Sequence, residues 1–163
     1  MAASLLLKLI ARITAFNIRN WSLRPIQTQE KQFKYLINSA KKTSFGTDHN
    51  FQKISSYKDF VNNVPVREYE GIRPYIERVK NGERNILWPG RPIYFALTSG
   101  TTSGSKYIPI TKESLKNHLN GAKNAILNYV DQTKKTSFIK GKFIFIQGSP
   151  LLDKMSELSL IHI

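Results

Sequence analysis

The sequence predicts an α/β fold in which a mainly helical region, residues 1–85, is followed by the beginning of a β-sheet. Apolar residues recur at helical spacing in the first half of the chain, whereas two short apolar, β-rich runs flank a loop at 93–110. A second helical pattern covers 112–131, and a further apolar run at 142–147 is typical of a buried strand.

The first predicted helix is basic and amphipathic, and no acidic residue precedes Glu30. Lys8 and Arg12 interrupt its apolar run, which makes it too short and too charged to span a bilayer. Two interpretations stay open: a helix whose apolar face packs on the domain, which we favour, and an N-terminal targeting segment, because transit peptides share this composition.

Proline and hydroxyl residues mark the next helices. The first helix is predicted to break at Pro25, because the residue before a proline is disfavoured in the α region. Thr28 is predicted to cap a second helix, and Ser55 or Ser56 a short third one. A fourth helix is predicted to begin near Pro74, since proline is favourable in a first turn.

The helix predicted over 112–131 carries a regular apolar stripe that we expect to face the core. The stripe consists of Leu115, Leu119, Ala122, Ile126 and Val130. At the other end of the chain, residues 157–163 stop without a cap, a turn or a charged tail. A truncated or misread reading frame is therefore one interpretation of that tail.

The loop between the two predicted strands is rich in hydroxyls and glycines and closes on a lysine. Hydroxyls are small rotatable donors, and glycine lets backbone amides approach an anion closely. Consecutive turn amides form a concave nest for oxyanions, and lysine adds a point charge. The predicted phosphate-binding residues are Thr98, Ser99, Gly100, Thr101, Thr102, Ser103, Gly104 and Lys106.

This loop is not the nucleotide-binding P-loop, which needs four residues between its glycines and opens directly into a helix. Here three residues separate Gly100 from Gly104, Ser105 precedes the lysine, and a strand follows. A flexible linker is the alternative for such a composition. The apolar runs on both sides favour phosphate binding over a linker.

Composition narrows the possible chemistry. The chain has 25 Lys and Arg against 11 Asp and Glu, a formal net charge of +14, which favours anionic partners. The charges are scattered, and no block of five like charges occurs. Because there is no cysteine, disulfides, cysteine-ligated zinc and cysteine nucleophiles are excluded. The three histidines, His49, His118 and His162, lack metal-ligand spacing, so no metal site and no catalytic residue is assigned.

Residues 98–106 resemble the phosphate loop of adenylate-forming enzymes, with one extra residue before the second glycine. The form Ser-Gly-Thr-Thr-Ser-Gly-x-Lys-x-Ile-Pro is similar to one branch, the GH3 (auxin-responsive promoter) family of acyl acid–amido synthetases. Residues 64–70, 72–76, 81–83 and 143–150 also resemble that family, although only the loop is a specific motif.

The resemblance implies that the chain is the N-terminal part of a cytoplasmic ligase and begins its large domain with a mixed sheet. It also implies that ATP and Mg²⁺ are used to activate a small carboxylic acid as an acyl-adenylate, which an amino acid amine then converts to an amide. The loop hydroxyls and Lys106 would contact the β- and γ-phosphates. The fragment alone is expected to be inactive, since the residues for adenine, ribose, acid and amine lie downstream in this family.

Two rival functions stay open. An acyl-CoA ligase uses a similar loop but passes the acyl group to a thiol. A non-catalytic basic module that binds nucleic acid or an anionic surface is the rival from another class. No aromatic-rich stacking motif or nucleic-acid fold signature is visible, so we expect no specific nucleic-acid partner. We also expect no membrane span, because the apolar run of the first helix is short and carries Lys8 and Arg12.

Overall fold

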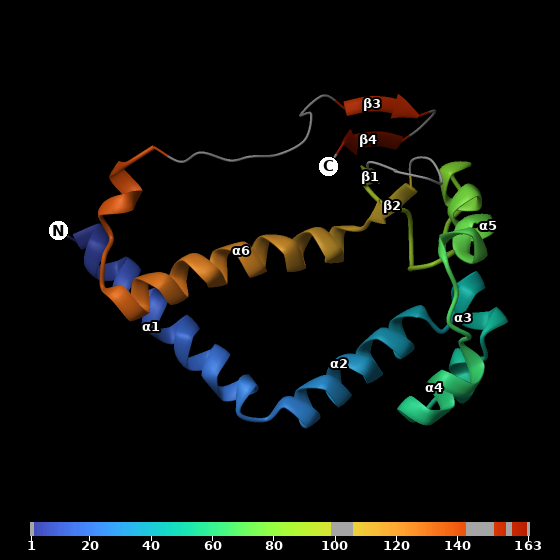
Figure 1. Ribbon diagram of the computed structural model, residues 1–163, viewed down its shortest axis with the longest axis horizontal. Helices are drawn as coiled ribbons and strands as arrows, with labels where there is room; N and C mark the ends of the chain where they lie inside the picture. Colours follow the sequence, from blue (N-terminus) through green and yellow to red (C-terminus); the bar gives the residue numbers. More distant parts are fainter. Residues whose placement is uncertain (1, 99–105, 143–151, 156–157, 163) are drawn as a thin grey trace. The chain divides into compact units, whose positions relative to one another are not determined.

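A computed structural model of the chain describes residues 2–98, 106–142, 152–155 and 158–162 (Figure 1). Its helices are α1 (Ala2–Ser22), α2 (Pro25–Ala40), α3 (Ser44–Asp48), α4 (Tyr57–Asn63), α5 (Tyr69–Lys80) and α6 (Lys112–Thr133), with 3-10 turns η1 (Phe51–Lys53) and η2 (Ser137–Lys140). Its strands are β1 (Tyr94–Thr98), β2 (Lys106–Ile110), β3 (Leu152–Met155) and β4 (Leu158–His162). The prediction of a helical N-terminal region followed by a sheet is confirmed.

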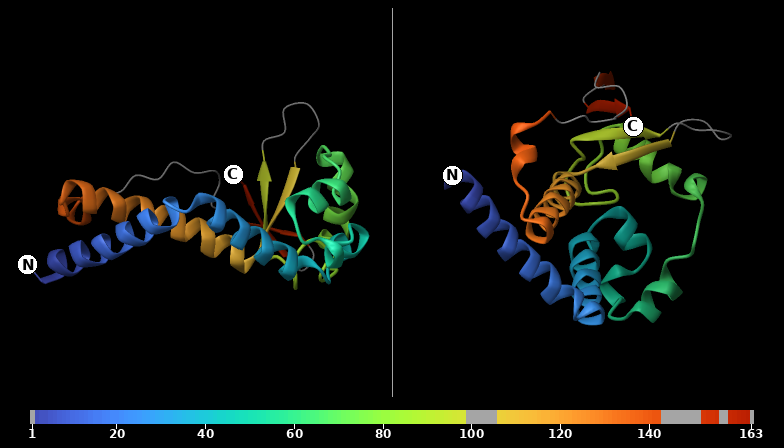
Figure 2. Two further views of the ribbon diagram at one scale, coloured as in Figure 1. Left: turned by 90° about the horizontal axis from the view of Figure 1, so that it is seen from below. Right: turned by 60° about the vertical axis from the view of Figure 1, so that its left-hand side comes forward.

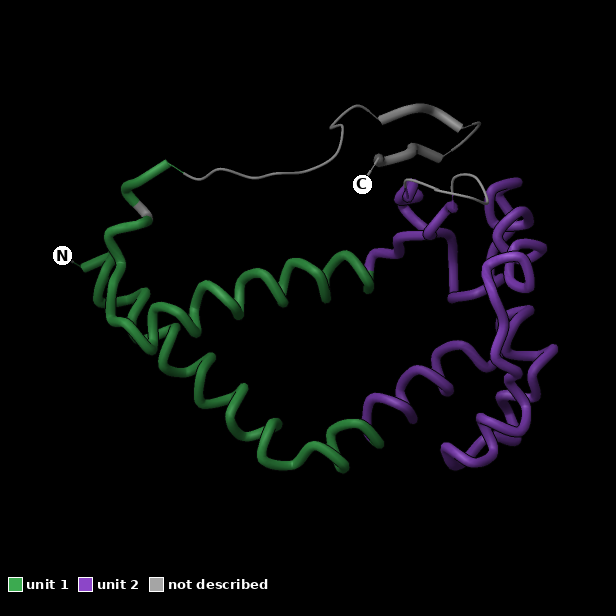
Figure 3. The backbone as a smooth tube through the Cα atoms, viewed as in Figure 1, with its two compact units in different colours: residues 1–30, 113–146 green, residues 31–112, 147–163 purple. Residues whose placement is uncertain are grey.

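The chain divides into two compact units, residues 1–30 with 113–146 and residues 31–112 with 147–163 (Figure 3). In the first unit α1 packs on the C-terminal part of α6. Ala11 is fully buried there with Leu127 and Val130, and the hydroxyls of Ser4 and Thr136 lie 2.8 Å apart. The interpretation that the apolar face of α1 packs on the domain is correct only in part, because the buried residues of α1 are Ala11 and Ala15. Most of its large apolar side chains are exposed: Leu5, Leu6, Leu9, Ile10, Ile13 and Phe16. No helix among the described residues is long and apolar enough to cross a membrane.

The apolar stripe predicted for α6 is only partly correct as a core. Val130 is fully buried, but Leu119 and Ile126 are exposed, and the second buried residue is Leu127. Residues three apart lie on one side of a helix, so Leu127 and Val130 together face Ala11 of α1. A periodic stripe identifies a helix more securely than it identifies the surface that another element covers.

Two helix starts differ from the predictions. α2 begins at Pro25 rather than after Thr28, whose amide donates to the Arg24 carbonyl and whose hydroxyl donates to the Trp21 carbonyl. Proline suits the first helical position, where an N–H would lack a partner. α5 begins at Tyr69, so Pro74 lies inside the helix rather than at its start.

The N-terminus of α4 has the predicted cap. The Ser56 hydroxyl accepts a hydrogen bond from the Asp59 amide at 3.1 Å, and the Asp59 carboxylate accepts one from the Ser56 amide at 2.9 Å. This reciprocal pair is a capping box, in which each residue satisfies a donor of the other. The short helix α3, capped by Thr43, was not predicted, because five residues give no readable periodicity.

The second unit has two apolar cores. One joins α2 to the segment around η1 through Ile37, Ala40, Phe51 and Ile54. The other joins α5 to β1 through Ile76, Val79, Ile86 and Phe95, with Tyr69 and Tyr107 packed against it. The second core holds α5 against β1, one of the two strands that flank the predicted loop.

The sheet has the strand order β2-β1-β4-β3. β1 runs antiparallel to β2 and parallel to β4, and β3 runs antiparallel to β4, so the sheet is mixed, as predicted. Both views of Figure 2 show β1 and β2 side by side. The strand predicted at 142–147 falls almost entirely on 143–151, which lie outside the described residues, and the suggestion that 157–163 are not native stays a prediction.

Candidate functional site: the base of the β1–β2 hairpin

The structure places the two ends of the predicted phosphate loop opposite each other. Thr98 is the last residue of β1, Lys106 is the first of β2, and they are direct partners in the antiparallel register. Such partners lie about 4.5–5.5 Å apart between Cα atoms. The other predicted loop residues, Ser99, Gly100, Thr101, Thr102, Ser103 and Gly104, lie outside the described residues.

Burial fixes the hairpin beneath these two residues. Phe95 of β1 is fully buried and Ala96 is nearly so. The ring of Phe95 meets that of Tyr107 of β2 edge to face, with the ring centroids 6.2 Å apart. The amide of Ile93 donates to the carbonyl of Ile110 at 2.8 Å and closes the far end of the pair. The strand ends that carry Thr98 and Lys106 therefore rest on a packed base.

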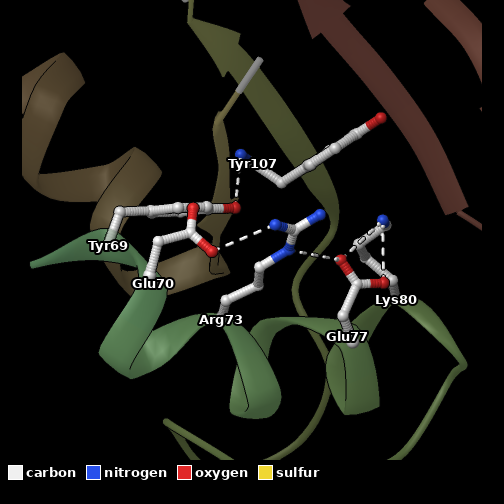
Figure 4. A network of polar contacts seen from close by, with 6 residues as sticks. All are labelled: Tyr69, Glu70, Arg73, Glu77, Lys80 and Tyr107. Carbon is white, nitrogen blue, oxygen red and sulfur yellow. Dashed lines mark hydrogen bonds and ion pairs between the residues drawn. The ribbon is translucent and has the colours of Figure 1, made fainter. Parts of the chain in front are cut away.

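Helix α5 lies beside this hairpin and touches it through Tyr69, its first residue (Figure 4). The Tyr69 hydroxyl accepts a hydrogen bond from the backbone amide of Tyr107 at 2.9 Å. The Lys106 ammonium lies 5.8 Å from the centroid of the Tyr69 ring, within reach of a cation–π interaction. One tyrosine thus contacts the lysine at the end of the loop and the residue after it.

A row of alternating charges follows Tyr69 along α5. Arg73 pairs with Glu70 at 3.0 Å and with Glu77 at 4.0 Å, and Glu77 also binds Lys80 at 2.9 Å. These spacings of three and four residues put the partners side by side on the helix. The hydrogen bond that Arg73 donates to the Glu70 carboxylate, together with the negative charge of that carboxylate, raises the pKa of Arg73 above its ordinary value.

Lys80 links this row to the hairpin. Its ammonium lies 4.1 Å from the centroid of the Tyr107 ring while it binds the Glu77 carboxylate, and only 15% of its side chain is exposed. Lys80 is therefore a neutralised, packed cation. Lys106, in contrast, has no ion-pair partner among the described residues, because Glu70 and Glu77 are paired with cations of α5.

Thr98 contributes a hydroxyl donor and Lys106 an ammonium, two groups of the kind that hydrogen-bond to anions. Within the described part of the chain no group of three or more His, Asp or Glu side chains is placed to hold a metal ion. Tyr69 and Lys80 were not predicted as neighbours of the loop. The one indication in the sequence was that residues 64–70, which contain Tyr69, resemble the same family as the loop.

Comparison with known proteins gives one family. The model of the GH3 family N-terminal domain matches residues 15–150, which include the whole hairpin. Indole-3-acetic acid-amido synthetase GH3.15 of Arabidopsis thaliana is 48% identical over 64 residues, which are 38% of this chain and 11% of the relative. Jasmonoyl–L-amino acid synthetase JAR4 of Nicotiana attenuata is 30% identical over 93 residues, which are 55% of this chain and 16% of the relative.

A solved structure of a GH3.15 acyl acid amido synthetase has the same fold over most of the chain. The TM-score is 0.68 at 24% sequence identity, and the match covers 82% of this chain and 24% of that one. The chain therefore matches only about a tenth to a quarter of the length of these relatives.

Proposed function

The chain belongs to the GH3 family, and on that premise we propose that it carries the ATP phosphate-binding loop of an acyl acid–amido synthetase. The proposal concerns the activity of the protein as a whole, since the matched segment is a small part of each relative's length. The observation that carries it is the pair Thr98 and Lys106, which brackets a run of hydroxyls and glycines and ends in a lysine without a carboxylate partner among the described residues.

The proposed reaction has two steps. A carboxylate oxygen of the acid attacks the α-phosphorus of ATP, the bond to the β-phosphate oxygen breaks, and an acyl-adenylate and pyrophosphate form. The amine nitrogen of an amino acid then attacks the acyl carbon, AMP leaves, and the nitrogen loses a proton as the amide forms. Mg²⁺ would arrive bound to the ATP phosphates and partly neutralise them. We place this reaction in the cytoplasm.

The contribution of this chain is to bind and orient the phosphates. Lys106 would offset negative charge that develops on the departing pyrophosphate, and fixed charges of this kind stabilise transition states without reorganisation. Thr98 and the loop hydroxyls of Ser99, Thr101, Thr102 and Ser103 would donate to phosphate oxygens. Gly100 and Gly104 would let backbone amides approach the same oxygens.

The acceptor is proposed to be an amine rather than the thiol of coenzyme A. The two relatives described above are named as an indole-3-acetic acid-amido synthetase and a jasmonoyl–L-amino acid synthetase, and both names describe the joining of an acid to an amino group. Product analysis with an amino acid mixture and with coenzyme A distinguishes the two acceptors.

The phosphate loop is tested by calorimetric binding of MgATP to the chain at about 0.15 M salt, where general attraction to a basic protein is screened. Lys106→Ala should weaken binding by about 1.5–3 kcal/mol, the range for hydrogen bonds to charged groups. Lys123→Ala removes the same charge from an exposed position of α6 and is the matched control. Equal affinities of the two variants would show that the loop is not the phosphate site.

Adenylation is tested by carboxylate-dependent exchange of pyrophosphate into ATP, with the chain alone and with the chain fused to the remaining length of a GH3 relative. We expect exchange from the fusion and its loss in Lys106→Ala and Gly100→Val, since valine blocks both the glycine dihedrals and close approach to the anion. Tight, sequence-selective RNA or DNA binding that tripolyphosphate does not displace would favour the nucleic-acid module instead.

A further inference from the structure

We propose that Tyr69 is a positioning residue for Lys106, the last residue of the predicted phosphate loop. The Tyr69 hydroxyl fixes the start of β2, and the Tyr69 ring orients the Lys106 ammonium. The inference rests on the proposed function, because it assigns Lys106 to phosphate. Two independent contacts carry it: the 2.9 Å hydrogen bond from the Tyr107 amide and the 5.8 Å approach of the Lys106 ammonium to the ring.

The hydrogen bond meets a specific need of β2. This strand lies at the edge of the sheet, and alternate residues of an antiparallel strand direct their amides away from the partner strand. Tyr107 and Pro109 occupy these outward positions, and proline has no N–H to donate. Tyr107 therefore carries the one outward amide donor within β2, and the Tyr69 hydroxyl satisfies it.

The position of that amide makes the bond relevant to the loop. Tyr107 directly follows Lys106, so a bond to its amide fixes the peptide that joins the two residues. The face of the Tyr69 ring then attracts the ammonium electrostatically without neutralising it, as a carboxylate would. Lys106 keeps its full charge for an anion while its range of positions is reduced.

Tyr69 is itself held from two directions. It packs against the core formed by Ile76, Val79, Ile86 and Phe95. Two residues upstream, Arg67 donates to Nε2 of the buried His49 at 2.7 Å, and His49 Nδ1 lies 2.8 Å from the Phe45 carbonyl. The segment entering α5 is thus tied to α3, and a well-supported group can position its neighbour more accurately than a mobile one.

The experiment compares Tyr69→Phe with Tyr75→Phe. Both variants remove a tyrosine hydroxyl from α5, and Tyr75 loses a 2.7 Å hydrogen bond to Asp48 away from the hairpin. Tyr69→Phe should weaken MgATP binding to the chain about two- to tenfold, the equivalent of one net hydrogen bond, and should speed hydrogen exchange of the Tyr107 amide. Tyr75→Phe should change neither measurement.

A double-mutant cycle with Lys106→Ala separates positioning from a general effect on the fold. If Tyr69 acts through Lys106, Tyr69→Phe should weaken binding little further once the lysine is gone. Equal weakening in both backgrounds, or unchanged exchange of the Tyr107 amide, overturns the inference. If Lys106→Ala weakens binding and Tyr69→Phe does not, the inference is wrong while the proposed function stands. If neither variant affects binding, both are wrong.

Discussion

Two glycine-to-alanine substitutions make the same chemical change inside a helix but should have opposite effects on stability. A Cβ atom added at Gly46, in α3, would clash with the Ala40 carbonyl oxygen and lie 3.0 Å from the carbonyl carbon. A Cβ atom added at Gly121, in α6, would have no atom within 4 Å. The first position is buried and the second is exposed.

The oxygen that blocks Gly46 cannot easily move away. It accepts hydrogen bonds from the Thr43 amide at 2.9 Å and from the Thr43 hydroxyl at 2.7 Å, and Thr43 is buried. Alanine in place of helical glycine gains about 0.5–1 kcal/mol, whereas overpacking costs about 1–3 kcal/mol. We therefore expect Gly46→Ala to lose about 1–2 kcal/mol and Gly121→Ala to gain about 0.5–1 kcal/mol.

Urea unfolding followed by circular dichroism measures both changes. Because the two glycines lie in different compact units, hydrogen exchange of individual amides shows which unit each substitution affects. Gly46→Ala should also loosen α5, since α3 contacts it through the Phe45 ring, 5.3 Å from that of Tyr75. Stabilisation by both substitutions would refute the close approach between Gly46 and Ala40.

Two further substitutions test local contacts. Hydrogen bonds from the Ser55 amide, the Ser56 hydroxyl and other donors lower the pKa of Asp59 from 3.8 to about 2. The ionised carboxylate therefore stabilises the native state above about pH 4, and this stabilisation is lost as the pH falls towards 2. The difference in melting temperature between the parent and Asp59→Asn should shrink over that range. Lys80→Met keeps an apolar stem but removes the ammonium over the Tyr107 ring, and should cost about 0.5–1 kcal/mol in urea unfolding.

Local patterns in the sequence were enough to predict the elements that depend on neighbouring residues alone. The Ser56 cap, the helix from Lys112 and the two strands around the loop follow from nearest neighbours and periodicity. The start of α5 was misplaced because proline is favourable in a first turn, yet here Tyr69 already begins the helix five residues earlier. The strand β4 was not predicted, because its partner β1 lies more than 60 residues earlier in the chain.

The candidate site was predictable only in part for the same reason. The loop could be predicted from its composition, and Lys106 from its place at the end of that run. The supporting contacts join residues far apart in sequence, as in the bond from Tyr107 to Tyr69, 38 positions away. No local pattern specifies such a pair, so it becomes visible only when the core of Ile76, Val79 and Phe95 brings α5 to the hairpin.

The large positive charge of the chain cannot by itself select ATP, because 25 scattered cations attract any polyanion. Selectivity needs a cation whose position is fixed and whose charge is not neutralised. On α5, Arg73 and Lys80 are fixed but paired with carboxylates, whereas Lys106 is held against an aromatic ring and has no ion-pair partner among the described residues. Binding at Lys106 should therefore persist at salt concentrations that abolish general attraction, and the difference in salt dependence between Lys106→Ala and Lys123→Ala measures this directly.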